Sequence, residues 1–196
     1  MIGYHFTGTT LRDGSPIPAV GVWLEHNGPI GPCQCGLHAS EHPFDALQYA
    51  PGVRLHRVEL QGDLVSHGDP IDKWAGRRRR IIASIDADAM LREFARWCAS
   101  QVLHLWNAPQ VVKDYLATGD EALQDAARGA ALGAAWDAAR GAALGAARGA
   151  ALGAAWDASR GAALAAARDA AWGAALAAQR ACFAERVELA FTTQEK

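Results

Sequence analysis

The first half of the chain alternates short apolar runs with glycine, proline and asparagine, a pattern typical of strands joined by turns. Residues 53–60 alternate apolar and polar side chains with a period of two, which predicts a half-buried strand. Residues 19–24 form a second candidate strand. Between these strands, residues 40–50 are expected to form a short helix that Ser40 caps and Pro51 ends.

A helical pattern replaces this alternation from residue 86 onward, where apolar side chains recur every three or four positions. Met90, Phe94 and Trp97 share one face of the first predicted helix, and a second, short helix is expected over residues 111–116. Residues 1–120 are therefore predicted to form a compact, β-rich α+β domain that includes a helical pair.

A four-residue repeat dominates the rest of the chain. From 128 to 180 every fourth residue is Arg, Leu or Trp, and alanine or glycine fills most positions between them. Alanine is the strongest helix former and no proline follows Pro109, so residues 121–191 are predicted to be an Ala-rich helical extension. Within it, residues 182–191 are amphipathic and should dock on another surface, whereas residues 192–196 are expected to fray.

The spacing of the repeat leaves its helical arrangement open. A spacing of four residues advances each large side chain by about 40° beyond a full helical turn, so the stripe winds around the helix. One long helix with a spiralling stripe satisfies this pattern, and so do two or more shorter helices packed together. We favour packed helices, because the small residues between the large ones allow close approach.

The composition narrows the compartment and the class of partner. A formal net charge of −2 argues against a general nucleic-acid binder, which is usually basic. The N-terminal residues lack the basic and apolar regions of a signal peptide, so the four cysteines are expected to be free or metal-bound thiols in a cytoplasmic protein. Arginine or aspartate interrupts the Ala-rich segment every few residues, so we expect no membrane partner.

Four consecutive arginines, Arg77, Arg78, Arg79 and Arg80, form one basic run. Such a run can contact phosphate groups or an acidic partner. If the run enters a strand together with the isoleucines that follow it, alternate arginines point to opposite faces and the patch is diluted. Nucleic-acid contact is therefore the less favoured interpretation, and a solvated charged face is the more ordinary one.

Two thiols and two imidazoles lie close together at Cys33, Cys35, His38 and His42. This set matches the ligand types of a four-coordinate zinc site. The spacing is unusual, because the two cysteines are separated by one residue, whereas zinc motifs normally have two to four. The alternative is a tight turn in which the cysteines pack as small apolar groups.

Three short motifs follow one another in the N-terminal half: Y-H-x-T at residues 4–7, G-L-H-x-S at 36–40 and A-x-x-Y-A at 46–50. The series resembles the NAD-binding core of ADP-ribosyltransferases and RNA 2′-phosphotransferases. The resemblance implies that His5 and Tyr49 hold the nicotinamide ribose and ring. It also implies an acidic or polar residue that completes catalysis, for which Glu59 is the candidate. Otherwise His5 and Tyr49 are half-buried polar residues of a small β-rich domain.

A second resemblance covers most of residues 1–120. A cysteine-containing turn leads into G-L-H-A-S at residues 36–40, and a short helix, a strand and a G-D-x-x-x-K segment at 68–73 follow. This order is similar to an uncharacterised domain of phage and bacterial proteins, some of which carry Ala-rich tails. It implies a phage or prophage setting and no known activity.

These patterns predict a protein that acts by binding, either to a protein partner such as a host defence system that it inhibits or to itself as an oligomer. Tryptophan and arginine concentrate interface energy. The repeat offers both types in Trp136, Trp156, Trp172, Arg140 and Arg160. A repeat that serves only as a spacer is equally open. We expect no cofactor in the binding protein. The alternatives are an NAD-dependent transferase that uses His5 and Tyr49, and a zinc site.

Overall fold

The computed structural model describes residues 1–101, 103–105, 107–134 and 157–194. The chain divides into two compact units. Unit 1 joins residues 1–92 to residues 180–196, and unit 2 comprises residues 93–179. The sequence predicted a boundary near residue 120. In the structure, residues 93–120 belong to the second unit, and the end of the chain belongs to the first.

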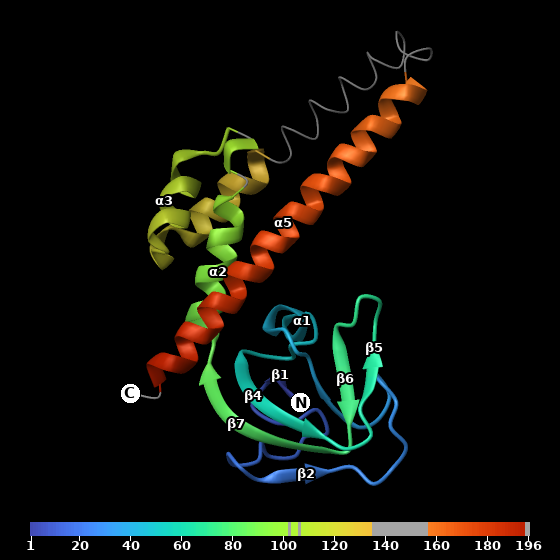
Figure 1. Ribbon diagram of the computed structural model, residues 1–196. Helices are drawn as coiled ribbons and strands as arrows, with labels where there is room; N and C mark the ends of the chain where they lie inside the picture. The colour runs from blue at the N-terminus through green and yellow to red at the C-terminus, as the bar shows by residue number, and fades with distance from the viewer. Residues whose placement is uncertain (102, 106, 135–156, 195–196) are drawn as a thin grey trace. The chain divides into compact units, whose positions relative to one another are not determined.

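Unit 1 contains two antiparallel sheets, which confirms the predicted α+β class with a β-rich N-terminal part (Figure 1). The larger sheet has the order β1-β4-β7-β2, with β1 Ile2–Thr7, β4 Arg54–Gln61, β7 Arg78–Asp86 and β2 Trp23–Glu25. The smaller sheet has the order β3-β6-β5, with β3 Leu37–Ala39, β6 Lys73–Gly76 and β5 Val65–His67.

The apolar core of unit 1 lies where the two sheets meet. Ala39 from β3 packs with Val58 and Leu60 from β4 and with Ile81 from β7. The alternation of residues 53–60 predicted the place of β4, but the strand is not half-buried. Leu55 is buried on one face, and His56, Val58 and Leu60 are buried on the other. Burying these side chains stabilises the unit by about 1.5–3 kcal/mol for each large aliphatic group.

Two local expectations were wrong in their extent. The strand expected at residues 19–24 is reduced to β2, because Gly21 adopts a left-handed φ of 86° and turns the chain just before it. The helix expected at residues 40–50 is α1, Pro43–Leu47, and His42 rather than Ser40 caps it. The His42 Nδ1 atom accepts a hydrogen bond from the Phe44 backbone N–H at 3.2 Å.

The last turns of the chain dock on unit 1 as the sequence predicted. Phe183, Val187 and Phe191 recur every four residues along α5, Asp157–Gln194, and all three are buried. Phe183 meets Phe44 of α1 edge-on, with ring centroids 6.1 Å apart. Polar contacts surround this apolar seam, including ion pairs of Arg180 with Asp45 and of Arg57 with Glu188, and a hydrogen bond from Tyr4 to Glu188.

Unit 2 is helical in the residues that the structure describes. It contains most of α2, Asp88–Ser100, and all of α3, Gln110–Thr118, which confirms the expected helical pair. Two short 3-10 helices, η1 Leu103–Leu105 and η2 Glu121–Leu123, lie on either side of α3. Residues 124–134 and the first part of α5 are helical as well. The arrangement of the repeat between them lies outside the described residues.

The sequence predicts no membrane partner, because charged residues interrupt the Ala-rich segment. Within the described residues, no helix combines the length and the apolar character needed to cross a membrane.

Candidate functional site

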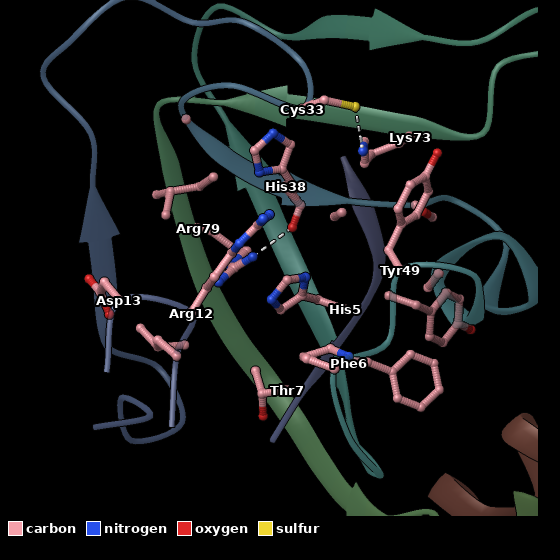
Figure 2. Close-up of a pocket in the computed structure, with 18 of the residues that line it drawn as sticks. His5, Phe6, Thr7, Arg12, Asp13, Cys33, His38, Tyr49, Lys73 and Arg79 are labelled. Carbon is pink, nitrogen blue, oxygen red and sulfur yellow. Dashed lines mark hydrogen bonds between the residues drawn. The ribbon is translucent and has the colours of Figure 1, made fainter. Parts of the chain in front are cut away.

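A cavity of about 710 Å³ opens in unit 1 between β1, β3, β6 and β7 (Figure 2). The loop after β1, the turn before β3, and α1 with the residues that follow it also line the cavity, and Arg12 and Cys33 belong to the first two of these segments. His5 and Tyr49 both line this cavity. The structure therefore brings together the two residues that the motif series singled out.

His5 enters the cavity from β1, where it lies opposite His56 of the neighbouring strand β4. Burial holds the pKa of His5 well below its ordinary value, and the positive charge of Arg79 lowers that pKa further. The imidazole is therefore neutral near pH 7. A neutral ring has one N–H donor and one acceptor nitrogen, which suits it to hydroxyl and amide groups of a ligand.

Tyr49 follows α1 and presents its ring to the same space. The Tyr49 hydroxyl donates a 2.6 Å hydrogen bond to Asp72 Oδ2, and this bond is the main reason why the Tyr49 pKa rises to about 12. The ammonium of Lys73 lies 3.7 Å from the centroid of the Tyr49 ring. These two contacts fix the orientation of the aromatic face.

Positive charge is concentrated along the walls. Arg79 is 6% exposed, and its Nη1 donates a 2.6 Å hydrogen bond to the His38 carbonyl oxygen (Figure 2). Burial lowers the pKa of Arg79 to about 10, so the guanidinium is still charged near pH 7. Lys73 is also buried, and its Nζ lies 2.9 Å from Cys33 Sγ. Arg12 adds a third cation from the exposed loop.

Negative charge is sparse in the same place. Among the residues that the structure describes, Asp13 is the single carboxylate that lines the cavity. It is exposed, and its Oδ1 accepts hydrogen bonds from the Ser15 backbone N–H and hydroxyl at 3.0 and 2.6 Å. These bonds hold the pKa of Asp13 below its ordinary value. The cavity is therefore suited to an anionic ligand.

Residues 1–93 match the family model of a domain of unknown function, DUF7666. No curated protein and no solved structure matches the chain. The matched range includes every residue that lines the cavity, so the cavity belongs to the DUF7666-like part of the chain.

Glu59, the candidate for the third catalytic position, lies away from this cavity. It follows Val58 on β4, and because Val58 and Leu60 face the core, Glu59 faces the other side of the strand. Its carboxylate accepts hydrogen bonds from Arg80 Nε at 2.7 Å and from Gln61 Nε2 at 2.6 Å. The structure therefore assigns it an ion pair at the surface of the sheet.

The basic run enters β7 and its arginines separate, as the strand alternative predicted. Arg77 pairs with Asp63, Arg78 with Glu25 and Arg80 with Glu59. Arg78 and Arg80 both lie over the Trp23 ring on one face, whereas Arg79 points into the cavity on the other. The run therefore forms no continuous basic patch.

The four candidate zinc ligands do not gather into one site. Cys33 lies in the turn that the Gly31–Cys35 bridge closes, and His42 caps α1. In the part of the chain that the structure describes, no three His, Cys, Asp or Glu residues lie close enough together to hold a metal ion. His38 instead lines the cavity, where burial, then Lys73 and Arg79, lower its pKa to about 4.

The binding residues expected in the repeat are not tested by the structure. Trp136, Trp156 and Arg140 lie outside the described residues. Arg160 and Trp172 belong to α5, but what their side chains contact lies outside the described part as well.

Sequence reasoning missed the cations of the cavity. Lys73 appeared only as the last position of the G-D-x-x-x-K segment, and Arg12 had no motif. Arg79 was one of four similar arginines, and what distinguishes it is the alternation of inward and outward side chains along β7. Ile81 is buried two residues later, so Arg79 shares the inward face.

Proposed function

We propose that unit 1 binds NAD in the cavity and that the protein is an NAD-dependent transferase that uses His5 and Tyr49. One observation supports this most strongly: these two residues come from separate segments of the chain and line the same cavity. The volume of about 710 Å³ is typical of sites for small molecules and cofactors.

The chemistry of the two residues fits the parts of the ligand. The Tyr49 ring, fixed by Asp72 and Lys73, offers an aromatic face for stacking against the nicotinamide ring. The neutral His5 imidazole offers one donor and one acceptor to ribose hydroxyls or to the carboxamide. In a transfer, the bond between nicotinamide and ribose breaks, nicotinamide leaves with the electron pair, and a nucleophile of the acceptor bonds to the ribose carbon.

Thermal unfolding with increasing NAD tests this proposal. A ligand that binds the folded state alone stabilises it by about 2.7 kcal/mol at a concentration 100 times its dissociation constant. We expect NAD to raise the unfolding temperature of the wild type and of a His104→Ala control, whose side chain is exposed in η1. His5→Ala should abolish the shift. An equal shift in His5→Ala, or none in the wild type, would contradict the proposal.

A Tyr49 pair separates stacking from hydrogen bonding. Tyr49→Phe keeps the ring and removes the bond to Asp72, whereas Tyr49→Ala removes both. We expect NAD affinity to fall much more in Tyr49→Ala than in Tyr49→Phe, measured by calorimetric titration. Equal losses would assign the role to the hydroxyl instead of the ring.

A second proposal, that the repeat binds protein, is supported by exposed leucines at repeat positions. Leu132 is 55% exposed and Leu176 is 38% exposed. Large aliphatic side chains at such positions are available for a protein partner or for a second copy of the chain. Light scattering of the full chain tests whether it associates with a second copy of itself.

A further inference from the structure

Arg79 is a buried charge that lacks a counter-ion. It is 6% exposed, and among the described residues no carboxylate lies within ion-pair distance of it. Its Nη1 donates a hydrogen bond to the backbone carbonyl oxygen of His38, which carries no net charge. Burying an ionised group is costly unless it is paired, so proteins rarely keep one without a reason. An anionic ligand would supply the missing partner.

A second observation points to the same end of the cavity. The Nε2 atom of His38 is buried and has no hydrogen-bond partner within the described part of the chain. Buried polar atoms of native proteins are nearly always paired, and an unpaired one marks a missing group. His38 lines the cavity, and both Arg79 and Arg12 act electrostatically on its ring.

Figure 2 shows how these groups converge. The side chains of Arg12 and Arg79 extend into the space between the rings of His5 and His38. Arg12 comes from the exposed loop and Arg79 from the inward face of β7. An oxyanion placed there would meet two guanidinium groups beside the ring of His38. Guanidinium groups bind phosphate oxygens through paired, parallel hydrogen bonds.

We propose that Arg79, Arg12 and His38 form a phosphate subsite of the cavity, and that it takes the diphosphate of a dinucleotide. In naming the dinucleotide, the inference rests on the proposed NAD binding. The subsite itself requires only a phosphate-bearing ligand. Two guanidinium groups match the two negative charges of a diphosphate. His5 and His38 are neutral, so they add no charge to the subsite.

Calorimetric titration with ADP-ribose tests the subsite, because this probe keeps the diphosphate and lacks nicotinamide. The variant is Arg79→Gln, and the matched control is Arg78→Gln, the preceding residue of β7, which pairs with Glu25 outside the cavity. We expect Arg79→Gln to weaken ADP-ribose binding by about 10- to 100-fold, the range for hydrogen bonds to charged groups. Arg78→Gln should bind as the wild type does.

Inorganic pyrophosphate provides a second test, which does not require the Arg79→Gln variant to fold. At constant ionic strength, pyrophosphate should raise the unfolding temperature of the wild type. Arg12→Gln, a change in an exposed loop, should reduce that shift. Failure of pyrophosphate and ADP-ribose to bind the wild type would overturn the subsite, and so would equal ADP-ribose affinities of Arg79→Gln and Arg78→Gln.

The outcomes also separate this inference from the proposed function. If ADP-ribose and pyrophosphate bind with the expected dependence on arginine but NAD does not, the subsite is supported and the NAD proposal fails. If NAD binds in a manner that needs His5 but tolerates Arg79→Gln, the NAD proposal stands and the subsite is overturned.

Discussion

His56 makes the stability of unit 1 sensitive to acid. This residue of β4 is 1% exposed and lies between two hydroxyl groups, with Nε2 2.8 Å from Thr7 Oγ1 and Nδ1 2.6 Å from Ser84 Oγ. Burial, followed by the charges of Arg79 and Arg54, lowers its pKa to about 4. The folded protein therefore holds the neutral imidazole, which the two hydroxyls satisfy as donor and acceptor.

The sign and size of the effect follow from the two states. In the unfolded chain His56 gains a proton near its ordinary pKa of about 6.5, whereas in the folded protein it does so only near 4. Between these values the unfolded state binds more protons, so the free energy of unfolding decreases as the pH decreases. The shift corresponds to about 3 kcal/mol lost between pH 7 and pH 4, at about 1.4 kcal/mol for each pH unit.

Urea unfolding at pH 7 and pH 4 measures this loss. His5 and His38 have lowered pKa values too, so the wild type should lose more than His56 alone explains. The comparison is therefore between His56→Gln and a control, His104→Gln, which changes an exposed side chain. The loss between the two pH values should be smaller by about 3 kcal/mol in His56→Gln and unchanged in the control. The reasoning is refuted if His56→Gln loses as much as the wild type.

Two further predictions concern the end of the chain and the repeat. Phe183→Ala should lower the free energy of unfolding by about 3–5 kcal/mol, because it empties a fully buried site, whereas the exposed Leu189→Ala should change it by less than about 0.5 kcal/mol, both measured in urea. If the repeat drives self-association, Trp136→Ala combined with Trp156→Ala should reduce the mass measured by light scattering and leave NAD binding unchanged. An unchanged mass in an oligomeric protein would assign association to another surface.

Elements with a regular pattern were predictable from the sequence. The period-two alternation identified β4, and the apolar spacing of residues 182–191 predicted a docking helix. Along the docking helix Phe183, Val187 and Phe191 repeat on one buried face, so the sequence carries the signal at every turn. In β4 both faces are buried at Leu55 and His56, so the alternation located the strand but not its burial. The strand at residues 19–24 failed because one glycine with a left-handed φ decides where it starts, and a single residue gives no periodic signal.

The cavity was predictable in part, for a similar reason. His5 and Tyr49 belong to motifs that the sequence shows directly. The positions of Glu59 and Arg79 could be predicted only from the register of β4 against β7. In that register Leu60 pairs with Arg79, and Glu59 pairs with Arg80. This pairing sends Arg80 outward to meet Glu59 and leaves Arg79 inward. One arginine of four therefore enters the cavity, and composition alone does not distinguish it.

The position of Glu59 outside the cavity also constrains the acceptor of a transfer. A hydroxyl acceptor must lose its proton to a base, but the described cavity offers only the exposed Asp13 and histidines of lowered pKa, which are weak bases. A phosphate monoester is already anionic near pH 7 and needs no such base. We therefore expect nicotinamide release from NAD to accelerate when a nucleoside monophosphate is added, and to be slow with water alone. Equal rates with and without the monophosphate would contradict a phosphate acceptor in this cavity.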